Sequence, residues 1–520
     1  MNFEEVDYFF SFSEELDLHL HSLSDWNGNE SDMLEFLEGA SKEVRRKASS
    51  ALYSLLMKDC NSSRAQWISS IQEAAMRLSE QGALPILANY LALVSEEINS
   101  SEHSMAQEQE LRTALNILFL MFKFLPQEEL KSDTAFYSST LEDALMHLIK
   151  ISTEISFIPI KKVSMLYLAY IELILDFPNK NETKFSKEIL EGLKAETPRH
   201  RIPPNNAVEM FYRRMMRKEN PLPQIIVVGL LRALLNCCPN ANTNGVDIKE
   251  EWLSPLRMFE ENEECFAGFR RRFNCQCQQC NESTHSAEHT RHKFITGLYI
   301  SKIFLLLMMR FKLNHIVQFS YLSQLMADAN GILVFLKFLN QDFSGNEVIK
   351  TPALPCFSEI HSEKIVEDCI STMLKVTYKL VKNHPERIKD NLIQYKSSLI
   401  FKRILNKLQV EEIQIDSLKL LRVQVKYLNK KWKSYPSNMH IISAIYHRLQ
   451  NKGEDWINDI ENTETLTADE VRQINHEFNF YHYWQGLDQK IEDSPQLPQD
   501  FHEKYEEWLE ENVWGYNYMF

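Results

Sequence analysis

One stretch, from Met308 to Phe343, constrains the fold more than any other part of the chain. Its first part carries apolar side chains at helical spacing, namely Ile316, Phe319, Tyr321, Leu322 and Leu325. The pair Asn330-Gly331 can turn without a Cβ penalty. A second predicted helix then shows the same spacing at Ile332, Phe335, Leu336 and Leu339. Because such a helix pair cannot bury its apolar face alone, it predicts stacked neighbours and a protein-binding surface.

The same turn-then-helix pattern occurs near the start of the chain, from Glu80 to Leu91. Gly82 supplies the turn, and Pro85 falls in the first helical turn, where its missing N–H does no harm. Only 13 of the 520 residues are glycine, and the chain is rich in Leu, Ile, Lys and Glu, which favours helix. We therefore predict an all-α, armadillo- or HEAT-like helical solenoid.

An amphipathic helix is also predicted from Val44 to Met57. Its apolar face carries Val44, Ala48, Ala51, Leu52 and Leu55, and the basic residues 45–47 lie around that face.

Changes in composition predict two helical halves joined by a proline-containing linker. Proline interrupts the periodicity at Pro198, Pro203, Pro204, Pro221 and Pro223. The expected organisation is a tail (1–31), an N-terminal helical half (32–177), a linker (178–220) and a C-terminal helical half (221–520). Residues 282–290 are expected to form a loop.

Charge and targeting signals narrow the class of protein. The net charge of −15 disfavours nucleic-acid binding, because phosphates would be repelled on average. Glu4, Glu5 and Asp7 are incompatible with a basic signal-peptide start, and no apolar run reaches the length expected to span a bilayer. The nine cysteines are therefore interpreted as reduced thiols of a cytoplasmic protein without membrane insertion.

A cluster of cysteines and histidines is the sharpest local chemical signal. Six candidate metal ligands lie within eighteen residues, namely Cys275, Cys277, Cys280, His285, His289 and His292. Cys277 and Cys280 have the spacing with which two thiolates hold one tetrahedral zinc, and two histidines could complete the site. The alternative is a polar loop with incidental cysteines. The histidines that would complete the site lack a compact ligand motif comparable to Cys-x-x-Cys.

A basic stripe is the second signal, within a stretch from Lys375 to Lys433 where basic residues exceed acidic ones. Lysine and arginine recur at steps of three and four residues at Lys419, Arg422, Lys426, Lys430 and Lys433, and Lys402, Arg403 and Lys407 precede them. On one helix the stripe would form a single face, opposite an apolar side that includes Leu418 and Leu421. The stripe is either a solvated face or a docking surface for a polyanion or an acidic segment. Residues 454–511, with seventeen acidic and three basic side chains, are an internal candidate for such a segment.

The sequence shows no pattern of an active site. It has no glycine-rich phosphate loop, GxSxG, HExxH or kinase signature set. A non-catalytic protein is therefore expected. The alternative that remains open is a zinc-containing adaptor or a polyanion-binding module.

Several segments together resemble the striatin-interacting protein family, the STRIP subunits of STRIPAK complexes. The most specific similarity lies at 310–319, 329–341, 418–428, 497–501 and 505–509, weaker similarity lies at 115–118 and 160–163, and residues 291–293 also fit. The first of these reads RFKLNHIVQF and the third LKLLRVQVKYL. The resemblance covers nearly the whole chain.

The resemblance implies a non-catalytic, armadillo-like scaffold. Its expected partners are a striatin-type protein, protein phosphatase 2A subunits, a Mob-family protein and a Ste20-type kinase. The implied assembly dephosphorylates those kinases and influences cell morphology, the cytoskeleton and signalling. Family members usually carry a longer disordered tail and an acidic insertion between the halves, so regulation placed there is not expected of this chain.

The resemblance also implies a cofactor, inositol hexakisphosphate. Its contacts cannot be transferred residue by residue. The basic stripe keeps the family pattern at Lys419, Arg422 and Lys426, so we place the cofactor there, with Lys430, Lys402 and Arg403 as further candidates. The cysteine-rich stretch is not a family motif, which makes zinc less central.

Overall fold

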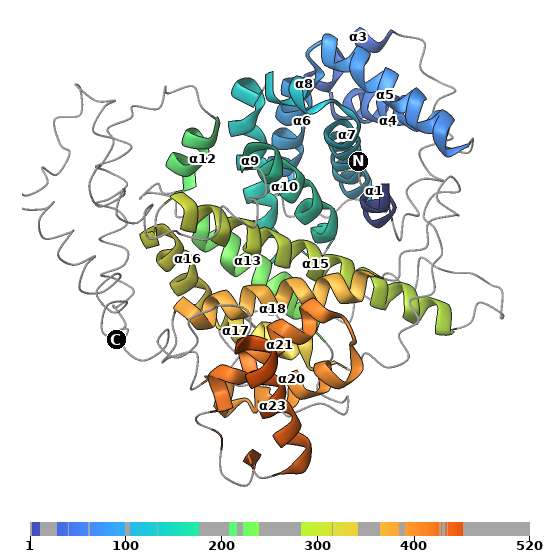
Figure 1. The fold of residues 1–520 in the computed structure, drawn as a ribbon. Helices are drawn as coiled ribbons and strands as arrows, with labels where there is room; N and C mark the ends of the chain where they lie inside the picture. Colours follow the sequence, from blue (N-terminus) through green and yellow to red (C-terminus); the bar gives the residue numbers. More distant parts are fainter. Residues whose placement is uncertain are drawn as a thin grey trace, which may run out of the picture. The chain divides into compact units, whose positions relative to one another are not determined.

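Every regular element in the described part of the chain is an α-helix (Figure 1). The structure is a computed structural model of the 520-residue chain. It describes residues 3–10, 29–39, 41–60, 63–98, 105–132, 134–155, 157–175, 207–215, 222–238, 282–314, 316–341, 364–383, 391–425, 428, 432–433 and 435–450. The all-α class predicted from the sequence is therefore confirmed.

The helices divide between two compact units. Unit 1 takes in residues 1–176, 259–303 and 345–366, and unit 2 takes in 177–258, 304–344 and 367–520. Unit 1 contains α1 (Phe3–Phe10), α3 (Glu30–Leu37), α4 (Lys42–Leu56), α5 (Arg64–Glu80), α6 (Ala83–Glu97), α7 (Met105–Phe124), α8 (Gln127–Ser132), α9 (Thr134–Ile151) and α10 (Ile160–Leu175). The long helix α15 (Glu282–Asn314) gives its first part to unit 1 and its last part to unit 2.

Unit 1 is built around α7, which packs against α4, α5, α6 and α10 (Figure 1). Leu111, Leu115 and Phe119 of α7 are fully buried, because an apolar residue on this helix meets a neighbour on almost every side. The ring of Trp67 on α5 meets Phe124 edge to face at 5.4 Å, a favoured aromatic geometry. Such all-round burial is typical of a central core helix.

Most helices of unit 2 pack against a helix that lies close to them in the chain. Its elements are α12 (Ala207–Met215), α13 (Leu222–Asn236), α16 (Ile316–Asp328), α17 (Gly331–Leu339), α18 (Ile365–Asn383), α20 (Ser397–Lys407), α21 (Glu411–Val425) and α23 (Pro436–Gln450). Helix α13 packs on α16 and α17, α17 on α20, α20 on α21 and α21 on α23. Most of the apolar positions predicted from Met308 to Phe343 belong to this core, with Leu322, Phe335 and Leu339 fully buried, whereas Tyr321 is half-buried.

Both predicted turn-then-helix pairs are present. Gly82, with φ of 72°, precedes α6, and Pro85 falls in the first turn of that helix, as predicted. At the second turn the left-handed residue is Asn330, with φ of 56°, and not the glycine after it. Asparagine tolerates this conformation better than most residues.

Gly331 is needed for a different reason than its turn conformation. A Cβ atom on Gly331 would lie 2.8 Å from the carbonyl oxygen of Met326 and 3.3 Å from Leu231 Cδ1. Backbone cannot move aside as a side-chain tip can, so only glycine lets α17 begin this close to α16. The sequence prediction located the turn correctly but assigned the role of the glycine incorrectly.

Replacing Gly331 with alanine is therefore expected to destabilise unit 2 by about 1–3 kcal/mol, the usual cost of forcing an extra methyl group into a packed site. The measurement is urea denaturation of the purified chain. Asn330→Gly is the matched control at the preceding position, and we expect it to be neutral or slightly stabilising because it removes left-handed strain. Equal stability of Gly331→Ala and the unmodified chain would contradict the close approach.

Three predicted boundaries differ from the structure. Residues 1–31, expected as a tail, contain α1 and the start of α3, and α1 belongs to unit 1. The expected linker, 178–220, contains α12. The expected loop at 282–290 is the first part of α15, because the polar residues there extend an apolar helix.

Among the described residues, one helix is long and apolar enough to cross a membrane by length and composition, which differs from the expectation that no run is long enough. The stretch Arg291–Asn314 has 24 residues, and its most apolar 18-residue window has a mean hydropathy of 1.6 and is 78% buried inside the protein. The pair Gln318–Asp328 and Gly331–Leu339 also passes the test as one span, but it is bent by 66°. Buried core helices have the same composition, and both stretches carry core residues here.

Candidate polyanion-binding site

Basic side chains of α18, α21 and the last part of α15 are close enough in unit 2 to repel one another electrostatically. Lys379 and Lys382 lie on α18, Lys419 lies on α21, and Lys312 lies in the last turn of α15. The other three ammonium groups all act on the amine of Lys379, and they oppose its protonation. We refer to these four lysines together with Arg422 of α21 as the unit 2 basic cluster.

Lys379 is the centre of this cluster. Burial is the largest cause that lowers its pKa, to about 8, and repulsion by Lys312, Lys382 and Lys419 lowers it further. The carboxylate of Asp416 acts in the opposite direction. Lys379 is half-buried among like charges, and a bound anion would offset the repulsion between them.

The carboxylates nearby already have partners. Asp416 Oδ1 lies 3.5 Å from Lys419 Nζ, and Glu412 Oε2 lies 2.9 Å from Lys375 Nζ. Burial raises the pKa of Asp416, while Lys419 and Lys375 lower it. Lys419 also lies over the ring of Tyr378, 5.3 Å from its centroid, which holds the ammonium group in place.

Arg422 adds donors that have no acceptor within the described residues. Its Nε and Nη1 atoms are buried and have no hydrogen-bond partner there. A guanidinium presents its donors in a planar fork that matches phosphate oxygens, and a buried unsatisfied donor is costly. Lys419 and Arg422 are one helical turn apart, so the fork lies beside the lysines.

Two other predicted site residues have structural contacts instead. Lys402 Nζ donates to Ser437 Oγ at 2.6 Å and to Asn438 Oδ1 at 2.7 Å. Arg403 Nη1 donates to the carbonyl oxygen of Asn340 at 2.9 Å, at the C-terminal end of α17. Cations stabilise helix C-termini in this way. Lys402 and Arg403 thus connect α20 to α23 and to the end of α17.

The predicted stripe does not form a single helix. Helix α21 ends at Val425, so Lys419 and Arg422 share a helix with each other but not with Lys433. Leu418 and Leu421 are buried opposite them, as predicted. Lys426 and Lys430 lie outside the described residues. The part of the predicted basic face that the structure describes is therefore Lys419 and Arg422 on α21, and the prediction for Lys426 and Lys430 stays a prediction.

The cysteine and histidine cluster stays a prediction. Cys275, Cys277 and Cys280 lie outside the described residues, and the side chains of His285 and His289 on α15 do too. Within the described part of the chain, no three metal-ligating side chains come together. Metal analysis of the purified chain before and after Cys277→Ser tests the zinc prediction.

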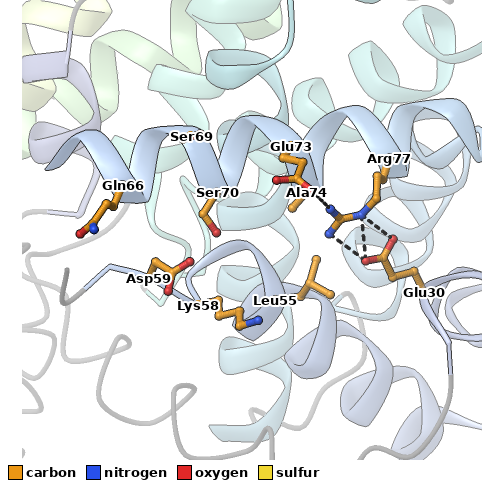
Figure 2. A pocket seen from close by; sticks show the side chains of 10 residues that line it. All are labelled: Glu30, Leu55, Lys58, Asp59, Gln66, Ser69, Ser70, Glu73, Ala74 and Arg77. Atoms are coloured by element: carbon orange, nitrogen blue, oxygen red, sulfur yellow. Dashed lines mark hydrogen bonds and ion pairs between the residues drawn. The ribbon is translucent and has the colours of Figure 1, made fainter. Parts of the chain in front are cut away.

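Unit 1 carries a surface hollow of about 650 Å³ between α5, the end of α4 and Glu30 of α3 (Figure 2). Figure 2 shows Arg77 between two carboxylates, with Glu30 Oε1 at 3.1 Å and Glu73 Oε1 at 2.8 Å. Its arginine is already paired with two carboxylates, and the hollow is open to solvent. Because Arg77 already has carboxylate partners, this hollow is a weaker candidate for an anion site than the unit 2 basic cluster.

The low pKa of Lys379 predicts a rise in stability at alkaline pH. Below pH 8 the lysine is charged in both the folded and the unfolded chain, so the cost of burying its charge is fully present. Between pH 8 and about 10.5 the folded chain loses the proton while the unfolded chain keeps it, so the free energy of unfolding increases. We expect an increase on the order of 2 kcal/mol, discounted for the solvent that reaches this half-buried amine.

Urea denaturation at pH 7.5, 8.5 and 9.5 measures this increase. Lys379→Met is expected to be more stable than the unmodified chain at pH 7.5 and to lose most of the advantage by pH 9.5. Lys407→Met, at an exposed position on α20, is the matched control and should give parallel curves. A constant difference between Lys379→Met and the unmodified chain at all three pH values would contradict the lowered pKa.

The helical chain matches a known protein family over most of its length. A family model described as "Domain of unknown function (DUF3402)" matches residues 174–352 and 348–507. This is well over half of the chain, and it includes all of the unit 2 basic cluster. Among solved structures, a designed armadillo repeat protein has a TM-score of 0.32 at 12% identity, covering 76% of this chain and 100% of the designed one.

Curated relatives then identify the family. Striatin-interacting proteins 2 of Mus musculus is 30% identical over 387 residues, covering 66% of this chain and 41% of the relative. Striatin-interacting protein 1 of Mus musculus is 31% identical over 264 residues, covering 43% of this chain and 31% of the relative. The chain belongs to the striatin-interacting protein family, as its motifs predicted. It spans about two fifths or less of the length of these relatives.

Proposed function

We propose that this chain is a non-catalytic scaffold subunit that binds a striatin-type protein. The observation that carries this proposal is membership of a family whose curated members are named for their interaction with striatin. Stacked helices in both units support it, because helix-on-helix architectures present extended surfaces to partners. Scaffolds act by holding partners close, which raises their effective concentration for one another.

The finer proposal concerns the rest of the assembly. Through the striatin-type protein, the scaffold brings protein phosphatase 2A subunits and a Mob-family protein to a Ste20-type kinase in the cytoplasm. This arrangement would regulate kinase phosphorylation and thereby cell morphology and cytoskeleton organisation. It rests on the family resemblance.

Affinity purification of the full chain tests the proposal. We expect a striatin-type protein to be retained, together with phosphatase subunits, and we expect the phosphatase to be lost when the striatin-type protein is depleted first. Retention of phosphatase after that depletion would contradict the proposed route of attachment. Recovery of nucleic acid alone, with no striatin-type protein, would contradict the scaffold function and favour the polyanion-binding alternative.

We also propose that the unit 2 basic cluster binds a multiply phosphorylated small molecule, inositol hexakisphosphate being the cofactor that the resemblance implies. Three features support this site. Lys379 is crowded by like charges, Arg422 has two buried donors without an acceptor in the described residues, and the nearest carboxylates are engaged by Lys419 and Lys375. A phosphate group would accept from the guanidinium fork and offset the lysine charges.

Isothermal titration calorimetry with inositol hexakisphosphate tests the site. The double variant Lys379→Glu/Arg422→Glu is expected to weaken binding at least ~100-fold, since two favourable charge contacts become repulsive. Lys47→Glu/Lys58→Glu, at exposed positions of unit 1, changes net charge equally and should alter affinity by less than about threefold. Equal affinity of both double variants would remove the proposed site.

The calorimetry has a second readout. A bound polyanion favours the charged form of Lys379, so binding at pH 8.5 should take up a proton from the buffer. The apparent enthalpy will then depend on the ionisation enthalpy of the buffer, and this dependence should disappear in Lys379→Met. Binding with no proton uptake by the unmodified chain would show that the anion lies elsewhere.

A further inference from the structure

Helix α1 packs against α7, α10 and the first part of α15 in unit 1, and we refer to the surface that these three helices present to it as the groove. Val6, Phe9 and Phe10 of α1 are fully buried, although the helix has only eight residues. The ring of Phe9 is stacked on Phe119 of α7, with centroids 3.8 Å apart and planes inclined by 6°. The groove thus receives the aromatic end of a short helix.

Cationic side chains from α15 and α7 meet the acidic side of α1. Arg291 Nη2 of α15 lies 2.6 Å from Asp7 Oδ2, and both side chains are almost completely buried. Lys123 of α7 forms an ion pair with Glu5. Two of the three carboxylates of α1, those of Glu5 and Asp7, thus face a cation, although the buried carboxylate of Glu172 on α10 also acts on Glu5.

Two neighbouring lysines of α10 hold the other end of α1. Lys161 Nζ donates to the carbonyl oxygen of Tyr8 at 3.0 Å, one of the carbonyl groups that a helix terminus leaves without a backbone partner. Lys162 Nζ lies 5.0 Å from the ring centroid of Phe9 and 5.4 Å from that of Phe10. Both lysines are 3% exposed, so these are contacts of a closed site rather than of a solvated surface.

A segment of this kind depends on its groove for its helical form. Eight residues are too few for a stable isolated helix, so the contacts with unit 1 order the segment. Nineteen residues, 11–29, separate α1 from α3, which begins at Glu30. Recognition of a short helix in a groove is a recurrent mode of peptide binding.

We propose that this groove of unit 1 is a recognition site for an acidic–aromatic helical segment of a partner protein, and that α1 occupies it in cis. The partner segment has the chemistry of Glu4–Phe10. It carries two acidic residues in its first turn, a third acid that reaches Arg291, and consecutive aromatic residues at its end. This site is separate from the unit 2 basic cluster and does not depend on it.

The test uses the full chain with a protease site introduced between residues 11 and 29 and cut after folding. A fluorescent peptide of residues 1–12 is then added, and its anisotropy is measured. We expect the peptide to exchange into the groove of the cut chain. The uncut chain should bind it at least ~100-fold more weakly, because the tethered α1 competes at a high effective concentration.

Peptide variants show whether binding uses the contacts described above. Asp7→Asn together with Phe9→Ala should weaken the peptide at least ~10-fold, whereas Glu4→Gln, at a half-buried position, should change affinity by less than about threefold. In the cut chain, Arg291→Gln should weaken the unmodified peptide but not the peptide that carries Asp7→Asn.

Three outcomes would overturn the proposal. The cut segment could resist displacement by excess peptide, or the cut chain could lose its helical circular dichroism, and either result would make α1 a permanent part of the core. Dimers of the uncut chain that disappear on Asp7→Ala would assign the groove to α1 of a second copy. Exchange that follows the expected order of peptide affinities supports the partner site.

Discussion

Replacing Glu110 with alanine is expected to lower the free energy of unfolding of unit 1 by about 3–5 kcal/mol, the usual cost of removing one partner from a buried ionic group. Glu110 lies on α7, and its side chain is 1% exposed. Its Oε2 atom lies 2.8 Å from Arg46 Nε, and its Oε1 atom lies 3.9 Å from Arg45 Nε. The hydroxyl group of Tyr90 donates to the same Oε1 atom at 3.3 Å.

The large effect follows from where these groups lie. Arg45, on α4, is 4% exposed at its side chain, and its second carboxylate partner is Glu97 of α6 at 2.7 Å. Without Glu110, Arg46 and the Tyr90 hydroxyl lose a hydrogen-bond acceptor, and Arg45 loses a nearby negative charge. Helix α7 is central to unit 1, so it cannot move away to let water replace the carboxylate.

Hydrogen exchange of α4 and α7, combined with urea denaturation, measures this effect. Glu110→Gln should cost less than Glu110→Ala because the amide oxygen can still accept a hydrogen bond. Glu43→Ala is the matched control on α4, since Glu43 forms only an exposed pair with Lys47, and we expect no measurable change. Similar stability of the Glu110→Ala and Glu43→Ala variants would contradict a structural role for the buried network.

The same residues show how far the sequence can predict the fold. The apolar face of α4 was predicted from its periodicity, and Ala48, Ala51 and Leu52 are buried as expected. Arg45 was placed outside that apolar face, but it is 3% exposed. Periodicity describes one helix at a time, whereas Arg45 is buried because α6 and α7 supply carboxylates from elsewhere in the chain.

The candidate anion site was predictable only in part, for the same reason. Lys419 and Arg422 were found from their spacing, and the excess of basic residues was recognised to begin at Lys375. Which lysines meet depends on the packing of α18 near α21 and on the position of Lys312 in α15, and no local pattern encodes this. The predicted stripe also continued through Val425, where the helix ends, because spacing alone does not locate a helix terminus.

Substitution of Asp7 by alanine is expected to have the second large effect, which is local opening of α1 rather than destabilisation of the whole of unit 1. Asp7 and Arg291 form a contact at 2.6 Å with side chains that are 1% and 2% exposed. Removing the carboxylate from such a pair typically costs about 3–5 kcal/mol, because the buried guanidinium loses compensation for its lost hydration. Unlike Glu110, Asp7 lies on an eight-residue helix with a long connection to the next element.

The chain can therefore avoid this cost by releasing α1 and hydrating Arg291. We expect hydrogen exchange of residues 4–10 to accelerate at least ~100-fold, while α4, α5 and α6 keep their protection, since local opening is limited by the docking free energy of one segment. Lys123→Gln, which removes a partly exposed ion pair with Glu5, is the matched control and should accelerate exchange less than ~10-fold.

A double variant tests whether apolar packing can replace the ion pair between Asp7 and Arg291. Asp7→Leu with Arg291→Met replaces the buried pair by apolar groups, which is often neutral or stabilising in a closed site. It should restore protection of α1 to within about tenfold of the unmodified chain, whereas each single variant should not. Loss of protection throughout unit 1 in Asp7→Ala would show that α1 and the rest of the unit unfold together, and it would contradict the local opening of α1.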